Sequence, residues 1–555
     1  MEQMTVRIIV VLVYSALGAV GNIVTVEEGT IQGTRLVFTD ETILNVNRTI
    51  DVYRGIPYAE APIGEKRFSP PEAKRYWSPE IWNGTEFRNA CPQTNPNIQS
   101  VETGEDCLYL NIFVPFSETV RLRPVMVWFH GGAFVVGTSS QPEFDPTVLS
   151  VVGDLIIINV NYRLGIFGFL TTGEGINLLI LSYLFSVSQY SNRAVELDTN
   201  KAIEDGRSVG RDLNCDYQTS RDFITCLRNK TTDEILEAQR KVVLQTVNVI
   251  PFVPTVDGYF LADKPTKLLE NGNFKSAKIM IGNNKDEGTL WAVRAYPAFL
   301  TTRNPPKMPL AEFREVFPEF VYWYKDPHTA DAIEQQYLDW TIVDDTNADH
   351  FETFVKLTTD QSFACPANDV ARAHVVNGND VYRYEMTHVP KTSVWTLKKR
   401  VGPKWMGATH GEDLPFMFGW GFNDAFDDRY GEQPEDEKKM AVQFMTYWAN
   451  FANYGNPNGN SSAIQNLPYP EWPKFTLPEL EYKQLSKEME NGRALRADGC
   501  SFWRNYVPRL ATYTGEISDV EKEWRESYYT WKYDDMPGWK TAFNDYKNND
   551  QCEMP

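Results

Sequence analysis

The chain has 555 residues, of which 42% are apolar and 23% charged, and its formal net charge is −20. This length and apolar content exclude a disordered tail or a disulfide-only mini-domain, and they suffice to bury a large core. The acidic excess argues against nucleic acid and against anionic membrane surfaces as partners. No pattern in the sequence calls for a cofactor or a metal ion.

The first 21 residues have the layout of a secretory signal peptide. A short basic region that ends at Arg7 precedes an apolar run, Ile8–Leu17, and small residues follow up to Gly21. This run is too short to cross a bilayer, and no later stretch has the roughly 18 apolar residues of a membrane-spanning helix. We therefore expect a secreted protein that only a partner could anchor.

Two further features are typical of exported proteins. Sequons for N-glycosylation begin at Asn47, Asn83, Asn229 and Asn460. Six cysteines lie in the body, at Cys91, Cys107, Cys215, Cys226, Cys365 and Cys500, and Cys552 lies near the C-terminus. Six cysteines allow fifteen pairings, so the pattern alone does not choose. In an oxidising compartment, two short loops and one long closure form the plausible set, and Cys552 is a candidate for a bond between subunits.

Apolar runs alternate with amphipathic stretches along the body. The runs predict buried strands at Val125–Phe129, Leu155–Val160, Ile279–Ile281 and Val381–Met386, and the stretches predict helices at Asp233–Val243 and Glu435–Phe451. Strands alternating with helices indicate an α/β architecture with a mostly parallel sheet covered by helices. Sites in such sheets lie on loops beyond the carboxyl ends of the strands.

The first candidate site follows the strand predicted at Val125–Phe129. The stretch Trp128–Phe134 contains Gly131, Gly132 and Ala133. Adjacent glycines let successive backbone N–H groups point at one spot, as an oxyanion hole requires. A plain glycine turn is the alternative interpretation.

The second and third candidates are an acid and a base. Glu287 lies in Gly282–Gly288, just after the strand predicted to end at Ile281, and His410 lies between glycines in Gly407–Gly419. A lone histidine is more often structural, but this one follows both an acid at a strand end and an oxyanion-type turn. The chain order of acid and then base is the order that α/β-hydrolases use after their nucleophile.

Four blocks of the chain resemble the type B carboxylesterases and cholinesterases. They are Glu105–Pro115, Tyr53–Ala59, Asn161–Leu170 and Cys500–Trp503, and the likeness runs from about Val24 to Ala511. The resemblance implies an α/β-hydrolase domain over residues 22–512 that cleaves carboxylic esters through a Ser/Glu/His triad.

The same resemblance implies a role for each candidate residue. Glu287 would orient His410 as general base, and Gly131, Gly132 and Ala133 would line the oxyanion hole. It also implies the disulfides Cys91–Cys107, Cys215–Cys226 and Cys365–Cys500.

Residues 513–555 resemble the tryptophan-rich assembly tail of one class of cholinesterases. Apolar residues recur at steps of three and four, at Ile517, Val520, Trp524, Tyr528 and Trp531 and again at Trp539, Phe543 and Tyr546. The resemblance implies a homo-oligomer, with Cys552 linking chains, and a proline-rich anchor that would hold it at a cell surface or synapse. Pro537 is expected to interrupt the helix. The alternative is a stripe folded back onto the body.

The nucleophile of the family is missing. Members carry a Gly-x-Ser-x-Gly elbow after the block that ends at Leu170, but here Gly173–Ile176 leads straight into Asn177–Phe185, which resembles the helix after the elbow. A helix, a central strand and the elbow are absent, on the order of 40 residues. Removing a central strand leaves two unpaired sheet edges. A different strand could close the sheet, but the intact flanking blocks favour a skipped-exon or mis-assembled version of a longer enzyme.

One stretch satisfies the elbow pattern by accident. Gly206–Gly210 reads Gly-Arg-Ser-Val-Gly, but the preceding Glu196–Asp205 is polar and helix-like, which argues against Ser208 as the nucleophile. Ser182, Ser186 and Ser188 lack a glycine elbow altogether.

The substrate side also departs from the cholinesterases, which place a choline-binding tryptophan in the first disulfide loop. Residues 91–107 contain no tryptophan, so choline selectivity is doubtful. Leu290 and Trp291 could line part of a gorge wall, and Ile250 and Phe252 resemble the acyl-pocket segment.

Three hypotheses follow. The chain is a secreted carboxylic ester hydrolase by resemblance, inactive as written because it lacks the serine. It is alternatively a non-catalytic secreted binding or adhesion-type protein on the same fold, or a splice form that assembles through its tail with active subunits.

Overall fold

A computed structural model describes most of the chain. The described residues are 22–94, 101–119, 121–172, 199–245, 250–258, 261–302, 304, 306–321, 327–396, 404–459, 470–515, 524, 527–528 and 530–548. The predicted signal peptide, Ser182, Ser186, Ser188, Asn460 and Cys552 lie outside them.

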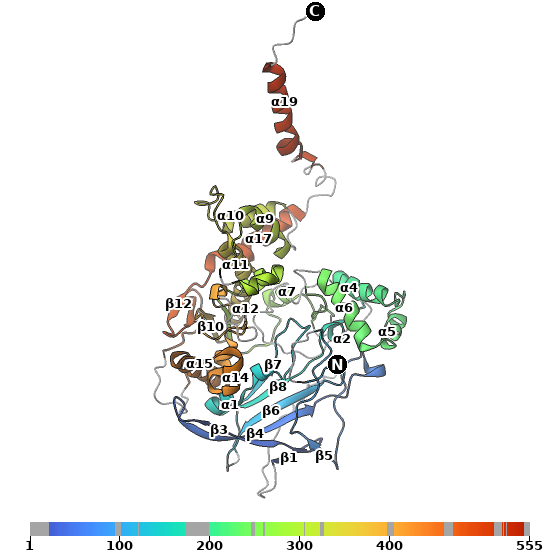
Figure 1. Ribbon diagram of the computed structural model, residues 1–555, viewed down its shortest axis with the longest axis vertical. Helices are drawn as coiled ribbons and strands as arrows, with labels where there is room; N and C mark the ends of the chain where they lie inside the picture. The colour runs from blue at the N-terminus through green and yellow to red at the C-terminus, as the bar shows by residue number, and fades with distance from the viewer. Residues whose placement is uncertain are drawn as a thin grey trace, which may run out of the picture.

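A five-stranded sheet forms the lower half of the body (Figure 1). Its order is β3-β4-β6-β8-β7, with bounds Thr34–Asp40, Val46–Pro57, Tyr109–Pro115, Ile156–Val160 and Val125–Phe129. The strands from β3 to β8 pair antiparallel, and β7 pairs parallel with β8. The strand predicted at Val125–Phe129 therefore has the expected bounds and lies at the end of this sheet.

A second sheet of four strands contains mainly parallel pairs. Its order is β12-β11-β10-β9, with bounds Asn491–Arg493, Glu481–Leu485, Val381–Met386 and Ile279–Asn284. The pairs β9–β10 and β10–β11 are parallel, and β12 is antiparallel. A small third sheet joins β1 (Ile23–Val26), β2 (Gly29–Gln32) and β5 (Ile81–Asn83). The sheets are thus mixed, and parallel pairing surrounds the strands that carry the candidate site.

The strands β7 and β9 are end strands of their sheets, and no described strand joins them. Met126 and Trp128 of β7 pack against the same apolar cluster as Met280 of β9 and Tyr384 of β10. Every residue of β7 is at least partly exposed, and Val125 is 49% exposed, whereas the middle of β8 is buried. The two sheets therefore share one core, and of their two end strands β7 is only partly covered whereas β9 is almost wholly buried.

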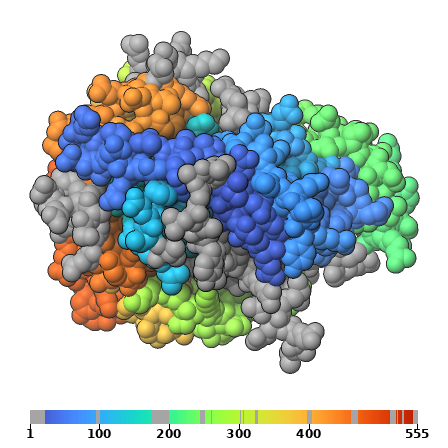
Figure 2. Space-filling model, turned by 90° about the horizontal axis from the view of Figure 1, so that it is seen from below, coloured from blue at the N-terminus to red at the C-terminus, as the bar shows by residue number. Residues whose placement is uncertain are grey.

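Helices surround these sheets. Their bounds are α1 Thr147–Gly153, α2 Gly165–Phe169, α4 Thr199–Asp212, α5 Ser220–Arg228, α6 Thr232–Gln245, α7 Pro265–Glu270, α8 Thr289–Ala295, α9 Leu310–Phe320, α10 Pro327–Tyr337, α11 Phe351–Thr359, α12 Cys365–Val376, α13 Leu414–Met417, α14 Asp424–Tyr430, α15 Glu435–Tyr454, α16 Ala497–Ser501, α17 Val507–Gly515 and α19 Met536–Asn548. Seen from below, the N-terminal strands in blue spread between α14–α15 in orange and α4–α6 in green (Figure 2).

The two predicted helices are present and slightly longer than expected, as α6 and α15. The helix α15 has three acidic residues in its first turn, which complement the helix dipole, and ends at Gly455 in the left-handed conformation (φ 63°). None of the described helices is both long and apolar enough to cross a membrane.

Three disulfides stabilise the body: Cys91–Cys107, Cys215–Cys226 and Cys365–Cys500. They form two short loops and one closure of 135 residues, between α12 and α16. The sequons at Asn47, Asn83 and Asn229 are exposed, so a glycan at any of them would meet solvent.

The helix α19 lies away from the body (Figure 1). Its aromatic side chains are largely exposed, with Trp539 at 78% and Tyr546 at 68%, so the described part of the stripe does not fold back onto the body. Helical structure continues past Pro537 but changes type there: a π-type segment, Thr530–Asp535, precedes Pro537, and Pro537 lies in the first turn of α19, where it removes no needed donor. The expected interruption therefore takes the form of a change from π to α geometry, not of an end to the helical path.

Candidate active site

Glu287 and His410 are hydrogen-bonded to each other. The strand β9 runs three residues further than predicted, to Asn284, and Glu287 lies in the turn that follows. One Glu287 carboxylate oxygen accepts the backbone N–H of Asn284 at 2.8 Å, and the other lies 2.7 Å from Nδ1 of His410. Glu287 is 4% exposed, whereas the His410 side chain is 36% exposed. The carboxylate is therefore fixed behind an imidazole ring that reaches the surface.

Hydrogen bonds from several groups that no sequence pattern marked as functional hold the loop that carries His410. The Asn284 side chain donates to the carbonyl of Thr409 at 2.7 Å, and the Ala408 N–H donates to Asp286 at 2.9 Å. Trp395 donates its indole N–H to the carbonyl of His410 at 2.9 Å. Asn284, Asp286 and Thr409 lie inside the motifs noted in the sequence, but Trp395 carries no local signal.

An aromatic ring supports the imidazole from the side. The ring centroid of Phe363 is 5.3 Å from that of His410, and Trp291 packs behind it at 6.4 Å. Trp291 is only 5% exposed and also packs against Phe320. It is therefore largely buried and supports Phe363. Phe252, expected in an acyl pocket, is likewise buried at 2% exposure, in a separate core cluster.

The electrostatic environment of His410 strengthens it as a base. Burial lowers the pKa of the imidazole, but the charge of Glu287 and its hydrogen bond outweigh this effect, so the pKa is raised. The neighbouring Asp413 has its pKa raised by burial and by the charge of Glu287. The Glu287–His410 pair thus favours an imidazole that accepts a proton readily.

The turn after β7 has the conformation expected of a backbone donor site. Gly132 has φ 120°, and a Cβ there would lie 1.9 Å from the carbonyl oxygen of Val136, so only glycine fits. Ala133 and Phe134 also have positive φ, at 54° and 62°. The N–H groups of Gly131, Gly132 and Ala133 donate to no acceptor within the part of the chain that the structure describes. Three successive donors are therefore available to a ligand.

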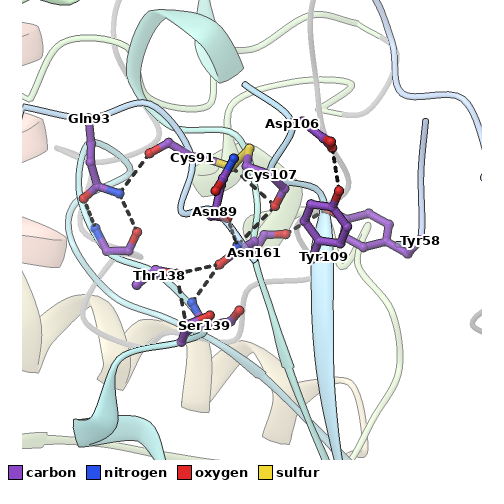
Figure 3. Close-up of a disulfide and its surroundings, with 12 residues drawn as sticks. Tyr58, Asn89, Cys91, Gln93, Asp106, Cys107, Tyr109, Thr138, Ser139 and Asn161 are labelled. Atoms are coloured by element: carbon purple, nitrogen blue, oxygen red, sulfur yellow. Dashed lines mark hydrogen bonds between the residues drawn. A yellow bond between two sulfur atoms is a disulfide. The ribbon is translucent and has the colours of Figure 1, made fainter. Parts of the chain in front are cut away.

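Hydrogen bonds from several elements fix this turn (Figure 3). Gln93 and Gly137 bond reciprocally through side chain and backbone, at 2.8 Å in each direction. Asn161 accepts from the N–H of Ser139 at 2.7 Å and donates to the carbonyl of Cys107 at 3.1 Å. The Cys91–Cys107 loop and the end of β8 thus hold the turn in place.

The turn and the acid–base pair lie on adjoining parts of one core. Trp128, the penultimate residue of β7, packs edge-on against Phe418 at 5.0 Å, and Phe418 belongs to the segment that follows His410. Both functional groups come directly after end strands, the turn after β7 and Glu287 after β9. The contact between Trp128 and Phe418 therefore joins the strand end before the turn to the segment after His410, 290 residues further along the chain.

The described residues contain no serine on a strand-to-helix elbow. Ser208, in the only Gly-x-Ser-x-Gly stretch of the sequence, lies inside α4, between the buried residues Asp205, Gly206, Val209 and Gly210. A residue within a helix lacks the strained turn that exposes a nucleophile. The objection to Ser208 raised by its polar, helix-like context therefore agrees with the structure.

Comparisons with known proteins agree on one family. The sequence profile described as the carboxylesterase family matches residues 20–177 and 184–503. Acetylcholinesterase of Bungarus fasciatus is 28% identical over 596 aligned positions, covering 95% of this chain and 93% of that protein. Acetylcholinesterase of Danio rerio is 28% identical, covering 94% of each chain, and cholinesterase of Mus musculus is 30% identical, covering 90% of each.

Proposed function

The chain belongs to the carboxylesterase family, and we propose that it is a secreted member that keeps the acid, base and oxyanion donors of a carboxylic ester hydrolase but lacks the nucleophile. As written, the polypeptide has no serine esterase activity, because a general base and oxyanion donors cannot form an acyl-enzyme without a nucleophile. The hydrogen bond of 2.7 Å between Glu287 and His410 is the observation that supports this proposal most directly, because it joins the acid and the base of the expected triad.

The roles of the retained groups follow from their geometry. Glu287 would hold the imidazole of His410 in one tautomer, with Nδ1 protonated and Nε2 free to take a proton. Gly131, Gly132 and Ala133 would stabilise the negative charge that develops on an ester carbonyl oxygen. A longer product of the same gene that contains the elbow would then cleave carboxylic esters.

Three observations support a missing elbow unit. The family match is interrupted at residues 178–183, and the alignment with the Bungarus fasciatus protein has more positions, 596, than this chain has residues, 555. The strands β7 and β9 are the two sheet ends expected after loss of a central strand. We infer that the lost segment lies after Thr172, near the break in the family match at residues 178–183, and that the chain is a skipped-exon or mis-assembled version of an enzyme.

A covalent probe tests the loss of activity. Protein from about Val20 onward is treated with a fluorophosphonate, which labels activated serines, and the adduct is measured by mass spectrometry. We expect no stoichiometric adduct. An adduct at one mole per mole would refute the proposal, and peptide mapping would show whether Ser208 carried it. The variant S208A is the matched control, because Ser208 lies inside α4 and not on a strand-to-helix turn.

Export and assembly are parts of the same proposal. The signal-like N-terminus, the three disulfides and the exposed sequons at Asn47, Asn83 and Asn229 support an extracellular glycoprotein. The exposed aromatics of α19 support a homo-oligomer formed through residues 513–555, with Cys552 linking chains and a proline-rich anchor as a further partner.

Sedimentation tests the assembly. The full chain should sediment as an oligomer, and a chain that ends at Thr512 or the double variant W539A/F543A should sediment as a monomer. Lys540→Ala, also exposed on α19, is the control that should leave the mass unchanged. An unchanged mass on removing residues 513–555 would contradict assembly through the tail.

A non-catalytic secreted binding protein is the second candidate function, and the lack of a nucleophile favours it. The intact Glu287–His410 pair argues for the enzyme lineage. Transcripts across Thr172–Asn177 discriminate between the two, because an in-frame segment that encodes a Gly-x-Ser-x-Gly elbow would restore the enzyme. This chain would then be a splice form that assembles with active subunits. The absence of a tryptophan from residues 91–107 argues against choline esters as the preferred substrate.

A further inference from the structure

A pocket outside the candidate active site lies beside α12 and the second sheet, near the labels α12, β10 and β12 of Figure 1. It is open to solvent and has a volume of about 30 Å³, which is room for about two water molecules or for a group of that size. Three arginines line it, together with an apolar wall: Arg372, Arg383, Arg504, Phe475, Leu480 and Leu495.

Arg372, on α12, keeps all its donors for a ligand. It is half-buried and has no hydrogen bond or ion pair among the described residues. Burial and the like charge of Arg504 lower its pKa, and only the charge of Asp369 opposes them. Asp369 is already the partner of Arg504, whose Nη1 donates to it at 3.1 Å. A guanidinium has five N–H donors, so Arg504 also keeps most of its own.

Arg383 adds a buried charge to the same pocket. It is 1% exposed, and its two Nη atoms donate only to neutral acceptors, among them the carbonyl of Tyr384 at 2.8 Å and the side chain of Asn283 at 2.6 Å. Its donors are therefore satisfied, but none of these partners cancels its charge.

The charges around the pocket do not balance. Arg496 is the neighbouring arginine, and it pairs with Asp360 at 2.8 Å and with Glu385 at 3.4 Å. The described groups are four arginines and three carboxyls, namely Arg372, Arg383, Arg496 and Arg504 against Asp360, Asp369 and Glu385. One positive charge is thus left over in a chain whose net charge is −20.

The apolar wall of the pocket has a strained backbone. Leu480 and Ala494 both have left-handed conformations, with φ of 58° and 56°, and the N–H of Ala494 donates to the carbonyl of Leu480 at 2.8 Å. Such conformations are unfavourable for a branched residue such as leucine and are typical of ligand sites. The wall is therefore fixed before any ligand arrives.

The size, charge and walls of the pocket define a class of ligand. A single negative charge balances the excess, whereas a phosphate or sulfate dianion would exceed it and lose more hydration on binding. A carboxylate matches the planar donor set of a guanidinium. We propose that a small aliphatic monocarboxylate binds here, with its carboxylate on Arg372 and Arg504 and its short alkyl stem against Leu480 and Leu495.

Asp369 gives this site a pH dependence. The charged groups that face it are Arg504 and Arg372, and burial outweighs their attraction and raises its pKa to about 6. Below that pH Asp369 becomes neutral and no longer competes for Arg504, while a free carboxylic acid, with a pKa of about 4.5, is still ionised. Binding of the carboxylate should therefore tighten as the pH falls from 7.5 to 5.5.

Saturation-transfer difference NMR on the full chain tests the site with butyrate as the probe. We expect saturable binding with a millimolar Kd that is several-fold tighter at pH 5.5 than at pH 7.5. Butyramide, the neutral analogue of the same size, should not bind. A lack of saturable butyrate binding, or equal binding of butyramide, would overturn the proposal. The measurement needs no catalytic serine, so its result is independent of the proposed function.

Three variants locate the binding. Arg372→Met keeps the apolar stem and removes the free guanidinium, so butyrate should bind at least about tenfold more weakly. Arg429→Met, which removes an arginine that pairs with Glu143, should bind butyrate like the wild type. Asp369→Asn removes the competing carboxylate, so it should bind about tenfold more tightly at pH 7.5 and lose the pH dependence.

The Asp369 variant keeps all the arginines and so covers the case in which the Arg372 variant does not fold. Unchanged or weaker binding by Asp369→Asn, or a pH dependence that persists in it, would refute the carboxylate site. Wild-type affinity in Arg372→Met would refute it as well.

Discussion

At the residue scale, the candidate site depends on buried carboxyl groups with different tasks. Both carboxylate oxygens of Glu287 have partners, because one accepts from the backbone of Asn284 and the other from His410. Glu412 lies two residues after His410, is 2% exposed and accepts the hydroxyl of Ser393. Ser393 in turn accepts the N–H of Trp395, whose indole holds the His410 loop. The environment of the base therefore includes a carboxyl group that favours its neutral form.

We predict that Glu412→Gln stabilises the protein at alkaline pH. Burial raises the pKa of Glu412 to about 8, so the folded state binds its proton more tightly than the unfolded chain does. The stabilising contribution of this proton is complete below the unfolded pKa and is lost as the pH rises through about 8. Urea unfolding at pH 5 and pH 9 should show an advantage of the variant over wild type, of about 3 kcal/mol, at the higher pH only.

Glu479→Gln, on the surface, is the control for this prediction and should show no such advantage. A variant of Glu412 that is equally stable relative to wild type at both pH values would contradict the raised pKa.

At the element scale, the candidate site lies directly after two strands that are also the end strands of their sheets. The turn of oxyanion type follows β7, Glu287 follows β9, and no described strand pairs with the outer edge of either. A strand within a parallel sheet is normally buried on both faces, but β7 is partly exposed along its whole length. Of the two end strands, β7 is therefore the less protected, because β9 is buried along almost its whole length.

Hydrogen exchange tests this interpretation. We expect alternate amides of β7 to exchange rapidly, since in an end strand every second N–H points away from the partner strand, while those of β8 stay protected. Peptides over 125–129 and 156–160 can be compared by mass spectrometry in one sample, so β8 is the internal control. Equal protection of both strands would show that another segment covers β7.

At the scale of the whole molecule, one long disulfide joins distant parts of the chain. Cys365–Cys500 connects the start of α12 to α16 and encloses β10, α15 and the His410 loop, over a separation of 135 residues. Cys215–Cys226 encloses only 11 residues. In the chain-entropy account, a longer closed loop restricts the unfolded state more strongly.

We therefore predict that the double variant C365A/C500A loses more stability than C215A/C226A, by about 2 kcal/mol. Urea unfolding of both variants against wild type measures the difference, and the short-loop variant is the matched control. Equal losses would indicate that contacts around the sulfurs, rather than loop closure, determine the effect.

Much of this protein follows from its sequence. Local apolar periodicity indicated the strands at Val125–Phe129 and Val381–Met386, and the family motifs pointed to Glu287 and His410, because strand formation and turn chemistry depend on neighbouring residues. The proposal that the nucleophile elbow is missing also comes from the sequence. Only the tertiary structure revealed that Trp395 and Phe363 position His410 and that Arg372, Arg383 and Arg504 line one pocket. These facts depend on which distant side chains meet in the core, and no local pattern encodes that.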